Sequence, residues 1–132
     1  MFLKHYLIAF PIMLVLDFIW LKFVAKSFYF SRMGHLLSEK LSYPPAIAFY
    51  TLYAGGIVFF CINPAMEVAS VKKALYLGAL FGFFCYMTYD LTNQSTLKNW
   101  PIAVSIVDII WGAAVSSVTS GLATFILLKM RG

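Results

Sequence analysis

Residues 102–128 read IAVSIVDIIWGAAVSSVTSGLATFILL, and this stretch decides the class of the protein. A helix that crosses a bilayer needs about 20 predominantly apolar residues, and this stretch exceeds that length with Asp108 as its single charged residue. Lys129 and Arg131 follow it, where long cationic side chains can reach the lipid headgroups. We therefore predict a transmembrane helix over residues 101–128.

Three further apolar segments precede this one and have similar lengths. They lie at about residues 5–26, 45–62 and 73–94. Tyr43-Pro44-Pro45 opens the second of them, since proline suits a first helical turn, and Asn63-Pro64 follows it. The prediction is an all-α fold, an integral membrane bundle of four transmembrane helices that forms a single domain over residues 1–132.

The composition supports the membrane assignment. Apolar residues make up 62% of the chain and charged residues 11%, against about 45–50% and about 25% in soluble domains. The mean hydropathy is +0.86. The net charge of +5 comes from cations scattered near the predicted helix ends, without a basic face carrying interleaved aromatic side chains. We therefore exclude nucleic acid as a partner and expect contacts with membrane lipids.

The orientation across the membrane is not decided by charge. With four crossings, one side holds Lys4, Lys72, Lys73, Lys129 and Arg131, and the other holds Lys22, Lys26, Arg32, Lys40 and Lys98. The side richer in Lys and Arg normally faces the cytoplasm, and here the count is five against five. The tie fits a dual topology with an antiparallel homodimer, and it equally fits a misplaced end of the first helix, which would assign Lys22 and Lys26 to the wrong side. A homo-oligomer therefore stays open.

Small residues mark where helices are expected to touch. Gly78 and Gly82 form a G-x-x-x-G pair, and residues 112–121 are rich in Gly, Ala, Ser and Thr. Such residues let helix backbones approach closely in lipid. We predict that these two stretches pack against other helices. The fourth helix is long for one crossing, so we also predict that it tilts or bends near Gly112 or Gly121.

Three aspartates, Asp17, Asp90 and Asp108, lie inside predicted membrane-spanning helices. A carboxylate at the centre of such a helix costs at least about 2.5–3.5 kcal/mol, so it usually faces the bundle interior or a water-filled cavity. Counted from the helix ends at about 1.5 Å per residue, all three fall in the same half of the bilayer. Their side chains can therefore converge. The structural alternative is that each aspartate reaches water, caps a helix or pairs with a lysine or tyrosine.

Polar and aromatic side chains accompany these aspartates. Tyrosine and asparagine residues lie four before and three after Asp90, on the same helix face, and a tryptophan follows each of the other two aspartates by three residues. We predict a ligand- or proton-binding site made of Asp17, Asp90, Asp108, Tyr86, Tyr89, Asn93, Trp20 and Trp111. Three carboxylates in one pocket would repel one another, which suits proton exchange or cation capture.

The sequence carries no metal-binding pattern, such as H-E-x-x-H or a cysteine cluster, and no phosphate-binding glycine loop. We therefore predict no metal and no cofactor. Cys61 and Cys85 do not form a C-x-x-C pair and are interpreted as small apolar residues. The aromatic side chains of residues 28–30 and 43–53 are interpreted mostly as lipid contacts, with an aromatic pocket for an apolar ligand as the second interpretation.

Five short motifs give the chain a family resemblance. They are Tyr43-Pro44-Pro45, Tyr53-Ala54-Gly55-Gly56, Tyr89-Asp90-Leu91-Thr92-Asn93, Trp100-Pro101 and Val107-Asp108-Ile109-Ile110-Trp111-Gly112. With these motifs the chain resembles, over nearly its whole length, the small bacterial membrane proteins grouped as domain of unknown function 2177. The resemblance implies a multi-pass protein of the bacterial inner membrane with four helices. It implies no activity and assigns no functional residue.

Three functions fit the sequence. The leading hypothesis is a small transporter or binding protein whose aspartates handle protons or a cationic or amphipathic solute, with Asp90 and Asp108 as the titrating groups and Asp17 as their partner. The second is a membrane-embedded enzyme that modifies a lipid or isoprenoid, with a carboxylic acid as general acid or base. The third is a subunit or assembly factor of a membrane complex, whose polar residues meet a partner helix.

Overall fold

The computed structural model describes residues 2–34 and 43–131, and every regular element in these two ranges is helical. In chain order the elements are α1 (Phe2–Trp20), the π-helical turn η1 (Leu21–Ala25), α2 (Lys26–Met33), α3 (Tyr43–Ile57), the π-helical turn η3 (Val58–Ile62), α4 (Asn63–Glu67), α5 (Val71–Thr96) and α6 (Ile102–Arg131). Within the described ranges, four helical stretches are long and apolar enough to cross a membrane, namely Phe2–Val24, Tyr43–Glu67, Val71–Thr96 and Ile102–Arg131. The predicted all-α fold with four such helices is confirmed.

Two predicted helix boundaries differ from the structure. The first helical stretch does not end at residue 26 but continues to Met33, because no glycine or proline interrupts residues 21–33. The second continues past residue 62 to Glu67, since Pro64 sits in the first turn of α4, where a missing N–H is tolerated. Lys40, one of the cations in the charge count, lies outside the described residues.

The fourth helix, predicted to tilt or bend near Gly112 or Gly121, is α6, one uninterrupted α-helix from Ile102 to Arg131. Its two glycines instead make room for α5. A Cβ atom added at Gly112 would overlap the ring of Tyr86, and one at Gly121 would overlap the side chain of Leu75. These glycines therefore serve helix packing and not a change of direction.

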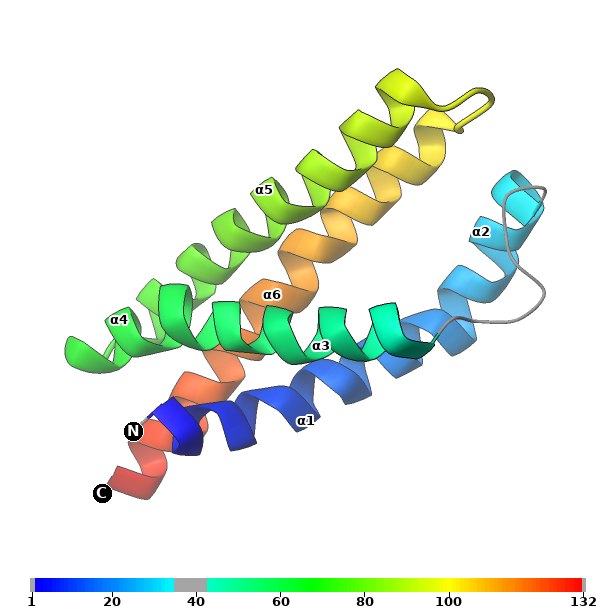
Figure 1. Ribbon diagram of the computed structural model, residues 1–132. Coiled ribbons are helices and arrows are strands. Elements are labelled where there is room, and N and C mark those ends of the chain that lie inside the picture. The colour runs from blue at the N-terminus through cyan, green and yellow to red at the C-terminus, as the bar shows by residue number, and fades with distance from the viewer. Residues whose placement is uncertain (1, 35–42, 132) are drawn as a thin grey trace.

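The α5–α6 hairpin is the most closely packed pair of helices (Figure 1). A Cβ atom at Gly78 would lie 2.5 Å from the carbonyl oxygen of Ser116, and one at Gly82 would overlap the carbonyl group of Gly112. The predicted close contact through these glycines is confirmed. At one end of the hairpin the Ser70 hydroxyl accepts from the Lys73 N–H at 3.0 Å and caps α5.

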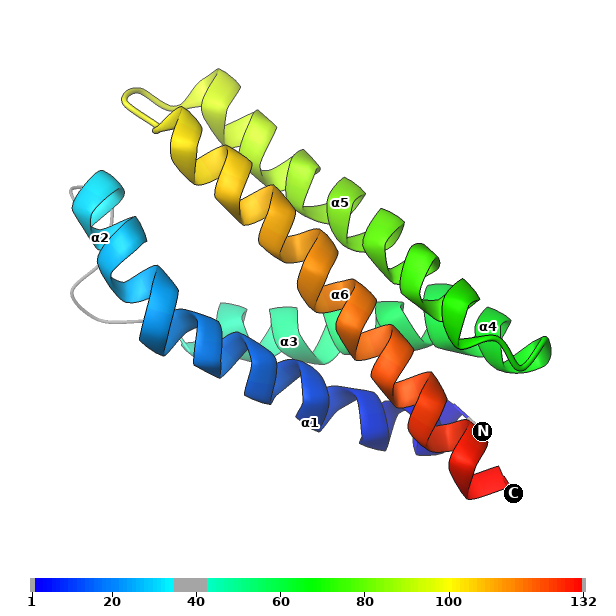
Figure 2. The ribbon, with the colours of Figure 1, turned by 180° about the vertical axis from the view of Figure 1, so that it is seen from behind.

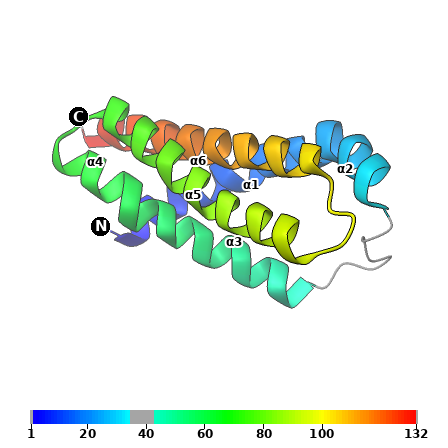
Figure 3. The same cartoon turned by 90° about the horizontal axis from the view of Figure 1, so that it is seen from above.

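The rest of the bundle packs most closely on this hairpin at the end near the chain termini (Figures 1 and 2). The α5–α6 pair and the α1–α3 pair lie together near the chain termini and diverge toward the opposite end (Figures 1 and 2). The core is close to the termini, where Ile57, Val58 and Ile62 have no exposed surface. The turn η3 contacts α1, α5 and α6, whereas α3 packs mainly on α1. Seen from above, both termini lie at the same end of the bundle (Figure 3).

Candidate functional site

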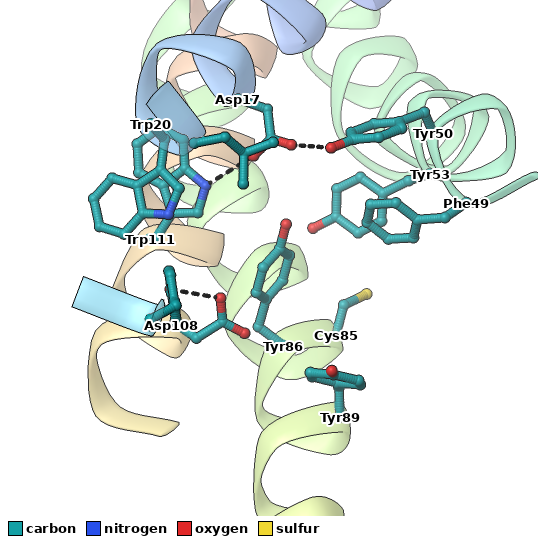
Figure 4. A pocket seen from close by; sticks show the side chains of 12 residues that line it. Asp17, Trp20, Phe49, Tyr50, Tyr53, Cys85, Tyr86, Tyr89, Asp108 and Trp111 are labelled. Atoms are coloured by element: carbon teal, nitrogen blue, oxygen red, sulfur yellow. Dashed lines mark hydrogen bonds between the residues drawn. The ribbon is translucent and has the colours of Figure 1, made fainter. Parts of the chain in front are cut away.

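A cavity of about 490 Å³ lies where the two helix pairs diverge (Figure 4). Eight of its lining residues are aromatic and two are aspartates. The lining residues are Asp17, Trp20, Leu21, Tyr29, Phe49, Tyr50, Tyr53, Cys85, Tyr86, Tyr89, Asp108 and Trp111. They come from α1, η1, α2, α3, α5 and α6, so the cavity is a feature of the assembled bundle. We call it the aspartate cavity.

The carboxylate of Asp17 connects three helices on one side of the aspartate cavity. Its Oδ2 accepts a hydrogen bond from the hydroxyl of Tyr50 on α3. Its Oδ1 accepts one from Nε1 of Trp111 on α6, at 3.2 Å. Donors of this kind stabilise a carboxylate that has left bulk water. Asp17 is therefore fixed in place and faces the cavity from α1 (Figure 4).

The rings of Trp20 and Trp111 stack, with centroids 4.3 Å apart and planes 7° apart. Each tryptophan follows an aspartate by three residues in the sequence. Because α1 and α6 run in opposite directions, the tryptophan of the α6 motif reaches the aspartate of the α1 motif. The indole N–H of Trp111 thereby has the carboxylate of Asp17 as its polar partner. The two motifs thus form one wall of the cavity.

Asp108 faces the cavity from α6 and is held by α2. The hydroxyl of Tyr29 donates to Asp108 Oδ1 at 3.0 Å. Burial, together with the negative charge of Asp108, raises the pKa of the Tyr29 hydroxyl well above its usual range, so that it stays protonated and donates. The ring of Tyr29 also meets the edge of Trp20, with centroids 6.4 Å apart. This hydrogen bond ties α2 to the cavity.

Tyr53 and Tyr86 lie toward the packed end of the cavity. The Tyr53 hydroxyl is 2.6 Å from the Ser116 hydroxyl of α6, and the rings of Tyr53 and Tyr86 meet edge to face at 6.0 Å. The Tyr86 side chain points into the space between Trp111 and Tyr53 (Figure 4). The fully buried side chains of η3 belong to the core against which these tyrosines pack. The cavity is thus closed on this side by the core.

The structure brings six of the eight predicted site residues to the aspartate cavity and leaves two outside it. Asp90 has no exposed surface, and neither of its carboxylate oxygens has a hydrogen-bond partner among the described residues. It does not line the cavity but is buried against α6, where the Ser105 hydroxyl lies 3.4 Å from its carbonyl oxygen. Asn93 lies near the end of α5, and its carbonyl oxygen accepts the Leu97 N–H at 2.9 Å. On this predicted face of α5, Tyr86 therefore lines the cavity, whereas Asp90 is buried at the contact with α6.

Six lining residues were not among the predicted site residues. They are Leu21, Tyr29, Phe49, Tyr50, Tyr53 and Cys85. Phe49, Tyr50 and Tyr53 have helical spacing, with Tyr53 four residues after Phe49 and three after Tyr50, and this common face is the signal that could have placed them together. No sequence pattern placed Tyr29 at the cavity, because its position depends on the first helical stretch continuing past residue 26. Within residues 2–34 and 43–131, no group of three or more His, Cys, Asp or Glu side chains is placed to hold a metal ion.

Comparison with known proteins gives the family. Residues 2–125 match the family described as predicted membrane protein (DUF2177). The chain therefore belongs to this family and is a multi-pass membrane protein. The resemblance drawn from the sequence motifs is confirmed. No curated protein and no solved structure matches the chain.

Proposed function

We propose that this member of the DUF2177 family binds an amphipathic organic cation in the aspartate cavity and carries it across the bacterial inner membrane. The observation that supports this most directly is the pairing of two carboxylates with eight aromatic side chains around one cavity of about 490 Å³. Ligand pockets for small organic molecules typically measure about 300–1,000 Å³ and combine apolar walls with a few placed polar groups.

The chemistry of the lining favours a positively charged ligand. Asp17 and Asp108 both line the cavity from membrane-spanning helices, where an ionised side chain is costly without a partner. Their hydrogen-bond partners are neutral donors, Tyr50, Trp111 and Tyr29, which hold the carboxylates without cancelling their charge. A bound cation would neutralise this charge. The aromatic faces would add cation–π attraction, which reaches about 2 kcal/mol or more at desolvated sites.

The aromatic walls favour an organic cation over a bare metal ion. A metal ion is held by converging oxygen, nitrogen or sulfur ligands, and most of the lining here is aromatic carbon. The stacked pair Trp20 and Trp111 presents a flat apolar surface beside Asp17. A ligand with aromatic or aliphatic groups around a positive centre would bury those groups against this surface. The ligand class is therefore amphipathic, with a single positive centre.

Two features of the fold support transport in addition to binding. The cavity lies at the divergent end of the bundle, and the core around Ile57 and Val58 closes the other end. Translocation would require the second end to open, and the π-helical turns η1 and η3 lie next to the cavity and in the core. Such turns occur often at functional sites. Asp90, a buried carboxyl group whose oxygens have no hydrogen-bond partner among the described residues, would exchange a proton as the cation leaves.

Binding of tetraphenylphosphonium to the purified protein in nanodiscs, followed by isothermal titration calorimetry, tests the proposed site. We expect Asp17→Asn and Asp108→Asn each to weaken binding at least about tenfold, equivalent to about 1.4 kcal/mol. Glu67→Gln is the control, because it removes a carboxylate that does not line the aspartate cavity. Triphenylphosphine oxide, an uncharged aromatic molecule, should bind equally to all variants. Equal affinities of the cation for wild type and both aspartate variants would refute the proposal.

Uptake by proteoliposomes separates transport from binding. Wild-type protein should accumulate radiolabelled tetraphenylphosphonium when an outward proton gradient is imposed, and Asp108→Asn should not. Binding without uptake would restrict the proposal to a binding protein. The oligomeric state of the same preparation, measured by native mass spectrometry, would show whether one chain or a homodimer binds each cation.

A further inference from the structure

A second cavity, of about 370 Å³, lies at the opposite end of the bundle from the aspartate cavity. Its walls come from the beginning of α1, from α4 and from the end of α6. Its polar lining residues are Lys4, His5, Asn63, Glu67 and Arg131. None of them lines the aspartate cavity. We call it the terminal cavity, because both chain termini lie at this end of the bundle (Figure 1).

One side of the terminal cavity is a fixed polar pair. His5 is only 7% exposed, and its Nδ1 lies 2.6 Å from Oδ1 of Asn63. Because an amide oxygen accepts, the ring donates through Nδ1, and this hydrogen bond connects α1 to α4. The buried histidine and the half-buried asparagine give the cavity a defined polar wall. The terminal cavity therefore has a fixed polar side in addition to the exposed cations at its edge.

The charged residues around this pair have both signs. Lys4 and Arg131 are exposed and approach the cavity from α1 and α6, while the carboxylate of Glu67 approaches it from α4. Two cations can hold a phosphate group, and arginine is suited to bidentate contact with it. A carboxylate repels a purely anionic ligand but attracts an ammonium group. The combination therefore matches a molecule that carries both phosphate and ammonium.

The location of the terminal cavity indicates where such a molecule comes from. It lies at the ends of membrane-spanning helices, where phospholipid headgroups are found. Leu3 and Leu7 of the same helix α1 are 68% and 61% exposed and give this helix an apolar surface. We propose that the terminal cavity binds the headgroup of an aminophospholipid, with the phosphate on Lys4 and Arg131, the ammonium on Glu67, and the acyl chains along α1.

Native mass spectrometry with an equimolar mixture of phosphatidylethanolamine, phosphatidylglycerol and phosphatidylcholine of identical acyl chains tests this site. Wild-type protein should retain the ethanolamine lipid preferentially, because only that headgroup combines phosphate with a hydrogen-bonding primary ammonium. Glu67→Gln should reduce the ratio of ethanolamine to glycerol lipid at least about fivefold, and the double variant Lys4→Gln/Arg131→Gln should reduce retention of both. These fold-changes correspond to the loss of one or two charge contacts.

Lys129→Gln is the matched control, because Lys129 is also near the end of α6 but its Nζ lies 5.5 Å over the ring of Phe125 and does not line the cavity. It should leave lipid retention unchanged. Thermal unfolding of each variant checks that the fold is intact, independently of any binding in the aspartate cavity. An unchanged lipid ratio in folded Glu67→Gln, or an equal effect of Lys129→Gln, would overturn the proposal. Full displacement of lipid by soluble phosphoethanolamine would overturn the membrane source of the ligand.

Discussion

The two ends of the bundle are built from the same four helices but differ in what fills the space between them. Near the chain termini, apolar side chains such as Ile57, Val58 and Ile62 are fully buried in a continuous core. At the other end the helix pairs diverge around a cavity that holds Asp17 and Asp108. Both ends lie in strongly apolar helices, so overall hydropathy does not distinguish them. The two ends differ in the size and polarity of the individual residues at the helix interfaces.

The α5–α6 seam shows how one helix face changes from one end to the other. On α5, Gly78 and Gly82 lie against the backbone of α6, and Tyr86, four residues further, is large and lines the cavity. On α6, Ser116 and Gly112 belong to the packed seam, and Asp108 follows at the same spacing. A change from small to large or charged residues at i, i+4 positions thus ends close packing and begins the cavity.

The largest effect is expected when the packed seam is disturbed. Gly82→Ala should destabilise the protein by about 1–3 kcal/mol, because its Cβ would overlap the Gly112 carbonyl group and overpacking typically costs this much. Gly55→Ala is the control, since its Cβ would lie 3.8 Å from the Phe2 ring, an ordinary contact. Unfolding in detergent, monitored by circular dichroism, measures both. Equal stabilities of the two variants would contradict the close packing of Gly82 against the backbone of α6.

On the cavity side, removal of one aromatic face should weaken binding and spare the fold. Trp20→Leu should weaken tetraphenylphosphonium binding about tenfold, because a stacked ring beside the ligand is lost while Trp111 still donates to Asp17. Phe84→Leu is the control, since Phe84 is 55% exposed and does not line the cavity. Calorimetric titration of both variants checks this. A similar loss in Phe84→Leu would show that the cation binds to the outer surface.

A smaller effect is expected from a single hydrogen bond to the cavity carboxylate. Tyr50→Phe removes a donor to Asp17 and should weaken cation binding about fivefold, in keeping with about 1 kcal/mol for one hydrogen bond. Tyr6→Phe is the matched control, because the Tyr6 hydroxyl donates to the Thr51 carbonyl oxygen at 2.9 Å outside the cavity. The ratio of the two dissociation constants is the measurement, and a ratio of one would remove Tyr50 from the site.

The smallest effect on binding is expected at Asp90. Because this carboxyl group is buried outside the aspartate cavity, Asp90→Asn should change tetraphenylphosphonium affinity less than about twofold, while proton-driven uptake is lost. The amide should leave thermal stability nearly unchanged, since it replaces a buried carboxyl group without a hydrogen-bond partner by a neutral group of the same shape. A large loss of affinity in this variant would mean that Asp90 contacts the ligand.

The sequence predicted the helices and half of the residues that line the cavity. It did not predict which side chains of a helix point toward which neighbour. Apolar length and flanking cations were enough for four helices, and the spacing of Gly78 and Gly82 was enough for the seam. The cost of charge in lipid pointed to Asp17 and Asp108. The same cost could not show that Asp90 is buried against α6. Neighbouring residues on one helix face can contact different helices, and the sequence does not show which.

The tyrosines of α2 and α3 were the larger omission. Aromatic residues near a membrane surface are usually in contact with lipid, and Tyr29 and Tyr50 were interpreted in this way. In the structure both hydroxyls donate to the aspartates of the cavity. Their role depends on helices that are far apart in the sequence, and no local pattern contains that information. The glycines of α6 show the same limit, because the sequence predicted a tilt or a bend there and could not show that they accommodate side chains of α5.

Photoaffinity labelling tests most directly whether the divergent end of the bundle is the ligand site. A triphenylphosphonium probe with an aryl diazirine would be activated in nanodiscs and its attachment sites mapped by mass spectrometry. We predict labels on Trp20, Tyr86 and Trp111, which line the aspartate cavity, and loss of these labels when unlabelled tetraphenylphosphonium is added. Labels confined to exposed apolar residues such as Phe18 and Phe84, undiminished by the competitor, would contradict a ligand site in this cavity.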